Sequence, residues 1–147
     1  DPIERVISSQ RMKLRKRGKL SPDEEVESLR SLVKKLPKRF SIRSNYVHTL
    51  NVLQESFGLE NCFINFYETL FTTQVYSQLC RFLNINYEEP NWGQKINAST
   101  SDTQIPEDIL EQLGTWQAPN FQAVKNKLPN VSIESIWPTS TTWCRPK

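Results

Sequence analysis

The first stretch of the chain places its hydrophobic residues at helical spacing. Asp1 has the short carboxylate of an N-cap residue, and Pro2 suits the first helical position, where a missing N–H costs nothing. Gly18 follows a turn rich in Lys and Arg and is a typical residue after a helix end. The pattern therefore predicts a helix from Asp1 to about Gly18. Its apolar residues share one face, which we expect to be buried: Ile3, Val6, Ile7 and Leu14.

Three further stretches carry helix signals. Ser21 and Glu24 have capping-box spacing around a proline, and Pro37 ends the apolar stripe that follows them. Either Thr72 or Thr73 can cap a later helix. Apolar residues at spacings of three and four support each of these helices. We predict helices over residues 21–36, from about residue 43 to 57, and from 73 to 83.

Residues 62–67 break the helical pattern. Their sequence, Cys-Phe-Ile-Asn-Phe-Tyr, is rich in aromatic and β-branched residues and alternates only lightly. This predicts a strand buried on both faces, as in a parallel sheet. A single strand cannot satisfy its own backbone groups, so it needs partners outside this sequence or unrecognised within it. We interpret the chain as the later, mainly helical half of an α/β domain.

The last third of the chain has weaker signals. No periodicity survives from residue 84 to 104, which predicts a long loop. Pro106 begins a short helix that we expect to end at Leu113, and Pro119 begins a second one that ends at Leu128. There are no internal repeats and no interdomain linker, so we treat residues 1–147 as one domain. The tail carries Ile133, Ile136 and Trp137 and then turns polar.

Composition and charge narrow the class of protein. The hydrophobic fraction is 37% and the mean hydropathy −0.58, which is low for a globular domain but above that of disordered chains. No apolar run approaches membrane-spanning length. The three cysteines and single His48 lack metal-ligand spacing, and Cys62 and Cys80 are typical small core residues. The net charge of +3 is modest. Basic residues nevertheless cluster in the later part of the first predicted helix and just after it: Arg11, Lys13, Arg15, Lys16, Arg17 and Lys19.

The opening segment, Asp-Pro-Ile-Glu-Arg-Val-Ile-Ser-Ser, resembles the 3′-phosphate-binding motif of sulfotransferases that use 3′-phosphoadenosine-5′-phosphosulfate (PAPS). That motif reads Arg-Asp/Asn-Pro-x-x-Arg-x-x-Ser, often with a Tyr two residues later. Gln10 stands where Tyr is common, and the family's leading Arg would precede Asp1. Four positions match the motif: Asp1, Pro2, Arg5 and Ser8.

Later segments resemble the same family in the same order. Residues 57–70 resemble its F-x-x-E-x-x-x-x-x-x-Y-E-D-L segment, with Thr69 in place of Asp, and residues 80–85 resemble its FLG-I ending. Lys95 lies where family members carry a basic loop that folds over the nucleotide, and Trp137 lies near a C-terminal Trp of many members. The resemblance covers nearly the whole chain.

The resemblance implies a P-loop-like α/β sulfotransferase fold, of which this chain supplies the helical C-terminal part and one strand. The implied reaction moves a sulfuryl group from PAPS to a hydroxyl or amine of a carbohydrate or small metabolite and leaves adenosine 3′,5′-bisphosphate. The implied nucleotide-binding residues are Ser8, Arg5 and Lys95. No Gly-rich loop with Lys is found, so we expect that loop and the catalytic base upstream of Asp1. We expect this chain alone to be inactive and to need the N-terminal half of the domain, in the same or another chain.

Other candidate residues have a structural interpretation beside the functional one. His48 and Glu68 are candidates for a base, although an exposed His and a paired Glu are the commoner roles of such residues. Tyr46, Arg43, Trp92 and Trp116 are candidates for substrate contacts, with packing as the alternative. We expect a cytoplasmic location, with the Golgi lumen as the alternative. We expect no metal and no membrane partner.

The basic cluster supports a competing hypothesis, a helical module that binds nucleic acid through phosphates or a protein-interaction module without catalysis. Against nucleic acid, acidic residues follow the cluster at once and no aromatic stacking platform is interleaved with it. A sulfotransferase would prefer adenosine 3′,5′-bisphosphate to AMP, whereas nucleic-acid binding would weaken steeply with salt.

Overall fold

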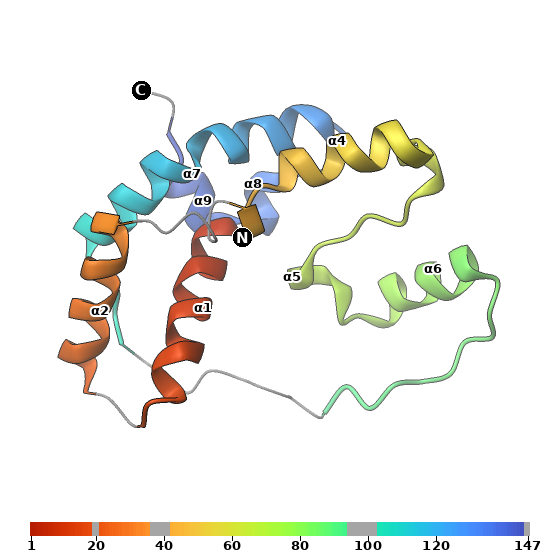
Figure 1. The fold of residues 1–147 in the computed structure, drawn as a ribbon. Helices are drawn as coiled ribbons and strands as arrows, with labels where there is room; N and C mark the ends of the chain where they lie inside the picture. The colour runs from red at the N-terminus through yellow and green to blue at the C-terminus, as the bar shows by residue number, and fades with distance from the viewer. Residues whose placement is uncertain (19–20, 36–41, 94–102, 146–147) are drawn as a thin grey trace. The chain divides into compact units, whose positions relative to one another are not determined.

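The computed structural model describes residues 1–18, 21–35, 42–93 and 103–145, and these residues form helices joined by turns and extended segments (Figure 1). The chain divides into two compact units, residues 1–49 with 99–147 and residues 50–98. The elements are α1 (Pro2–Arg15), α2 (Pro22–Lys35), α4 (Tyr46–Phe57), the 3₁₀-helix η1 (Leu59–Asn61), α5 (Tyr67–Leu70), α6 (Thr73–Leu83), α7 (Glu107–Lys127), α8 (Ile133–Ile136) and α9 (Pro138–Trp143).

The expected α/β fold with a parallel sheet is wrong. The described residues form an all-helical structure without a strand. The predicted strand does begin with extended backbone, with φ −115° and ψ 132° at Cys62 and φ −112° and ψ 143° at Phe66. However, Tyr67 already starts α5, and no second strand lies in the described residues to form a ladder. Aromatic and β-branched content therefore indicated an extended, half-buried segment and not a paired strand.

In the first unit, α1 and α2 lie side by side and run antiparallel, and α7 contacts both of them (Figure 1). The predicted buried face of α1 is confirmed, since Ile3 and Val6 are completely buried and Ile7 is 1% exposed. Helix α2 begins with the predicted capping box. The Ser21 N–H donates to Glu24 Oε2 at 2.7 Å, and the Glu24 N–H donates to Ser21 Oγ at 3.3 Å.

Helix α7 is one continuous helix, so the two separate helices predicted around Pro119 are wrong. A proline costs an interior helix one hydrogen bond, because it has no N–H to donate to the residue four positions earlier. Packing outweighs this cost, since side chains on both sides of Pro119 are buried. Ile109 and Leu113 precede it, while Phe121 and Val124 follow it.

The tail folds back as two short helices, α8 and α9, which the sequence pattern did not predict. Ile133 is fully buried and Trp137 is 4% exposed, so both anchor the tail in the core of the first unit. Helix α9 packs tightly on α7 at Gly114, where a Cβ atom would lie 2.3 Å from the Trp143 carbonyl oxygen. Only glycine permits this approach of the two backbones.

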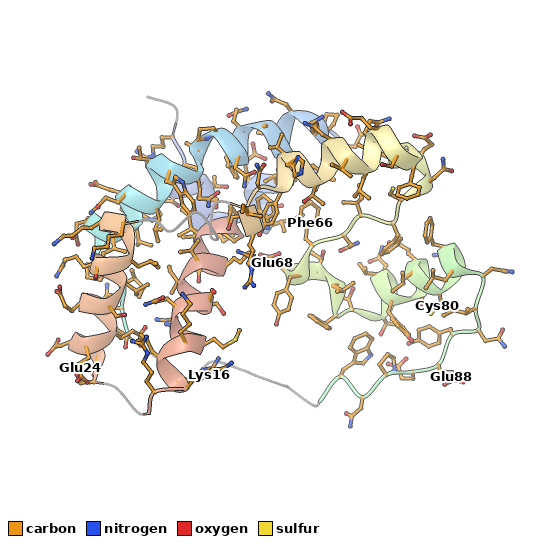
Figure 2. All side chains as sticks on the ribbon, in the orientation of Figure 1. Lys16, Glu24, Phe66, Glu68, Cys80 and Glu88 are labelled. Atoms are coloured by element: carbon orange, nitrogen blue, oxygen red, sulfur yellow. The ribbon has the colours of Figure 1, made fainter. Side chains whose placement is uncertain are left out.

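The second unit contains α5, α6 and the later part of α4. Helix α6 begins as predicted, with Thr72 Oγ1 accepting from the Val75 N–H at 3.3 Å, and ends at the left-handed Asn84. Its side chains contact neighbouring aromatic residues, as in the Phe63–Phe82 ring pair at 5.7 Å. Cys80 lies on α6 and is 2% exposed (Figure 2). Among the described residues of this unit, only Leu50 and Cys80 are buried hydrophobic side chains.

Candidate functional site

The motif aspartate lies at the junction of the first helix and the last one. Asp1 Oδ1 accepts from the Ile3 N–H at 3.0 Å and the Glu4 N–H at 3.4 Å, so Asp1 is the predicted N-cap. The same carboxylate accepts from the Ser140 N–H at 2.9 Å and the Ser140 hydroxyl at 2.7 Å. Thr139 donates to Glu4 Oε1 at 3.1 Å. The acidic residues at the start of α1 therefore hold α9 in place.

Arg5 has a structural partner. Its Nη1 donates to Ser44 Oγ at 3.0 Å, and Ser44 is 2% exposed. A guanidinium has five N–H donors, and no other hydrogen bond from Arg5 is found within the described residues. Arg5 is half-buried, so its remaining donors are still available to an anion.

Ser8 lies three residues after Arg5, on the same side of α1, because residues three apart are neighbours on a helix surface. Ser8 is exposed, and its hydroxyl makes no hydrogen bond to any described residue. Lys95, the third predicted nucleotide-binding residue, lies outside the described residues. The structure therefore brings Arg5 and Ser8 together and says nothing of Lys95.

Gln10, the departure from the family pattern, joins two helices. Its Nε2 donates to Ser28 Oγ on α2 at 2.8 Å. The residue that replaces the common Tyr therefore fastens α1 to α2, and this contact gives Gln10 a structural role in the described fold.

Part of the basic cluster makes hydrogen bonds and ion pairs within the first unit. Arg11 Nε lies 2.6 Å from Glu25 Oε1, and Arg11 Nη2 donates to the Thr103 carbonyl at 2.9 Å. Thr103 Oγ1 completes this group by donating to Glu25 Oε2 at 3.1 Å. Lys16 and Glu24 lie at the same end of the α1–α2 pair (Figure 2). Lys19 is outside the described residues. Sequence reasoning missed this group because its members are far apart in the chain and only the fold joins them.

Burial keeps one thiol inert. Cys144 is 5% exposed, and its burial raises the pKa of the thiol to about 11. Cys144 therefore stays protonated at neutral pH, and a protonated thiol is a poor nucleophile. Cys80 is buried as predicted, whereas Cys62 is only half-buried. Among the described residues, no group of three His, Cys, Asp or Glu side chains could hold a metal ion.

The residues predicted as a base or as substrate contacts lie far from Arg5 and Ser8 in the sequence. His48 is exposed, and its backbone N–H donates to Asn45 Oδ1 at 3.0 Å. Glu68 is exposed in the first turn of the short α5. Tyr46 packs with its ring centroid 5.7 Å from that of Trp137, which supports the packing interpretation.

No family model matches the chain, and no curated protein or solved structure is similar enough to count as a match. The resemblance to sulfotransferases therefore depends on the motif residues and their order along the chain. None of the described helices is both long and apolar enough to cross a membrane.

Proposed function

We propose that this chain contributes the 3′-phosphate side of a PAPS site in a sulfotransferase. The observation that carries the proposal is the pairing of Arg5 and Ser8 on one side of α1. Arg5 retains guanidinium donors beyond the one given to Ser44, and the Ser8 hydroxyl is exposed and without a partner among the described residues. A guanidinium and a hydroxyl one turn apart are suited to a phosphate.

A rigid frame supports these two side chains. Asp1 and Ser140 fix the first turn of α1, and the buried face of α1 fixes its rotation. Arg5 is further held by Ser44. Groups held in this way lose little conformational freedom when they bind an anion, which favours affinity.

The reaction proposed for the whole site is the transfer of a sulfuryl group from PAPS to a hydroxyl or amine. The bond between sulfur and the bridging phosphate oxygen breaks, a bond from sulfur to the acceptor atom forms, and the acceptor proton passes to a base. Adenosine 3′,5′-bisphosphate leaves. In this scheme Arg5 and Ser8 hold the 3′-phosphate and take no part in the bond changes, so they position the nucleotide.

Nucleotide binding to the full chain tests the proposal. Calorimetric titration should show tighter binding of adenosine 3′,5′-bisphosphate than of AMP, because only the former carries the 3′-phosphate. Ser8→Ala should weaken bisphosphate binding by about tenfold, the worth of one hydrogen bond to a charged group. AMP binding should not change.

Ser31→Ala is the control, since Ser31 is an exposed serine of another helix, α2, and is not a motif position. Its bisphosphate affinity should equal that of the unaltered chain. Equal affinities for the bisphosphate and AMP would overturn the proposal, as would equal losses in the two serine variants.

A further inference from the structure

The first unit contains a hollow of about 320 Å³ between α7 and the residues that lead into α4. This volume is in the range of small-ligand pockets. Trp116 and Pro119 of α7 form part of its wall, and Gln117 and Ser44 are its most buried lining residues, each 2% exposed. None of the described residues that line the hollow is charged.

The amide groups of the hollow are built into a fixed network. Asn120 Nδ2 donates to the Ser44 carbonyl at 2.6 Å and to Gln117 Oε1 at 3.2 Å. Asn120 Oδ1 accepts from the Val47 N–H at 3.4 Å. Both N–H donors of the Asn120 amide are therefore used, and its bond to Gln117 Oε1 sets the orientation of the buried Gln117 amide.

Two amide donors remain unused at the hollow. Gln117 Nε2 makes no hydrogen bond to any described residue, although the side chain is almost fully buried. Asn45 Oδ1 accepts from the His48 N–H at 3.0 Å, which leaves Asn45 Nδ2 without a partner in the described part of the chain. Neither nitrogen is a buried unsatisfied atom, so both donors are open to a ligand with acceptor atoms that occupies the hollow.

The indole of Trp116 adds an apolar platform. It is half-buried and makes no ring contact with the described aromatic residues, unlike Trp92 and Trp137. Pro119, one turn further, has no N–H, so the Thr115 carbonyl lacks its usual helical donor. The hollow thus combines a ring platform with unused donors.

These features exclude two ligand classes. An anion would find no cation among the described lining residues, since Arg5 contacts Ser44 but does not itself line the hollow. The Val47 and His48 N–H groups of α4 are already bonded to Asn120 and Asn45. A purely apolar ligand would cover the Gln117 Nε2 donor without offering it a hydrogen-bond acceptor. A neutral ring with a hydrocarbon face and a rim of hydroxyl groups satisfies both the indole and the amides, because hydroxyls accept and donate hydrogen bonds.

We propose that this hollow binds one pyranose ring of a neutral sugar, stacked on Trp116, with its oxygens accepting hydrogen bonds from Gln117 and Asn45. The ring is either a free monosaccharide or the end of a glycan. The proposal does not depend on nucleotide binding at Arg5 and Ser8.

Ligand-observed NMR on the full chain tests this site with neutral methyl pyranosides of glucose, galactose, mannose and N-acetylglucosamine. At least one of them should bind, and glucuronate should bind at least about tenfold more weakly. The free sugar and a short oligosaccharide of the best binder then distinguish the two sources. Absence of binding by every neutral glycoside, or preference for glucuronate, would overturn the proposal.

Two variants locate the binding. Trp116→Ala should weaken it by about tenfold through loss of the stacking surface. Asn45→Asp keeps the acceptor that caps α4 but removes the donor, so it should weaken binding by a similar factor without unfolding the chain. Asn126→Asp is the matched control, since Asn126 is an exposed α7 amide outside the hollow whose Oδ1 also accepts a hydrogen bond. Unchanged affinity in both Trp116→Ala and Asn45→Asp, or an equal loss in Asn126→Asp, would contradict this location.

Discussion

The two units of the chain differ in how far their large hydrophobic side chains are buried. The first unit buries large aliphatic side chains almost completely, with Ile109, Leu113 and Ile133 at 0% exposure. The second leaves large side chains in solvent, and Tyr67 is 76% exposed and Phe57 65% exposed. Since burial of apolar surface is the main favourable contribution to folding, the first unit has a core and the second has little of one.

The difference follows from how each unit is built. In the first unit, α7 contacts α1, α2 and α9, so apolar stripes of several helices meet. In the second unit, the longest helix that lies wholly within it is the 11-residue α6. A small unit exposes a larger fraction of its surface, and its local opening should cost less free energy than unfolding of the first unit.

The largest expected effect of this difference is on thiol labelling. Cys144 in the first unit is buried with its pKa raised to about 11, so its thiolate is about a hundredfold scarcer at pH 8 than that of an ordinary thiol. We expect iodoacetamide to label the half-buried Cys62 first, then Cys80, and Cys144 at least about a hundredfold more slowly than Cys62. Mass spectrometry of timed samples measures the order.

Cys80 is the informative thiol in that experiment. It is as buried as Cys144 but lies in the second unit, so its labelling reports how often that unit opens. Equal rates at Cys80 and Cys144 would show that the two units open together, which would contradict a lower free energy of opening for the second unit. Labelling in urea serves as the control, because all three thiols should then react at similar rates.

Core truncation should also separate the units. Leu113→Ala removes a side chain that is fully buried, so we expect a loss of about 2 to 5 kcal/mol in the free energy of unfolding. Leu83→Ala is the matched control, since Leu83 is 52% exposed in the second unit, and it should cost less than about 1 kcal/mol. Urea denaturation followed by circular dichroism measures both. Similar losses for the two variants would contradict the assignment of the core.

Local signals in the sequence were enough to predict α1, α2 and α6. Each begins at a capping residue that the sequence shows, Asp1, Ser21 and Thr72, and the structure confirms all three caps. Caps and apolar stripes act within a few residues, so one stretch of chain contains the whole signal. A correctly predicted helix did not always have a buried apolar face. Phe82 belongs to the apolar residues of α6, yet it is 48% exposed.

The errors arose where distant residues decide the outcome. The extended residues 62–66 needed a partner strand to become a sheet, and the described chain has none. Pro119 marks a helix start in isolation, but packing on both sides of it keeps α7 intact. The candidate site shows the same division. Arg5 and Ser8 were found from local spacing, whereas the contacts of Ser44 and Ser140 join residues 39 and 139 positions apart.

A glycine exchange probes the packing of α9 on α7. In an open helix, Gly→Ala stabilises by up to about 1 kcal/mol. At Gly114 the added Cβ would lie 2.3 Å from the Trp143 carbonyl oxygen, so we expect Gly114→Ala to destabilise by about 1 to 3 kcal/mol. Gly93→Ala is the control, because its nearest atom lies at an ordinary 3.4 Å. Thermal unfolding compares the two, and a stabilised Gly114→Ala would refute the close packing.

The smallest effects should come from the helix caps. Ser21→Ala and Thr72→Ala each remove a cap worth about 1 kcal/mol, from α2 in the first unit and α6 in the second. Native-state hydrogen exchange should speed up within α6 alone for Thr72→Ala. For Ser21→Ala it should speed up across the first unit, because α2 shares its core with α1 and α7. Exchange confined to α2 would show that this helix frays independently.

The Ser21 cap also predicts a pH dependence that the Thr72 cap lacks. Hydrogen bonds from the Ser21 backbone and hydroxyl lower the pKa of Glu24. A lowered pKa means that the folded chain favours the carboxylate, so this contribution is complete above the unfolded pKa of about 4.3 and is lost as the pH falls through the folded value. Ser21→Ala removes the hydroxyl bond but keeps the larger backbone bond, so between pH 7 and 3 it should lose slightly less stability than the unaltered chain. Thr72→Ala should keep the full acid-side loss. Parallel acid-side slopes for Ser21→Ala and the unaltered chain in urea titrations would refute the contribution of the hydroxyl, because it would then favour the acid and the carboxylate of Glu24 equally.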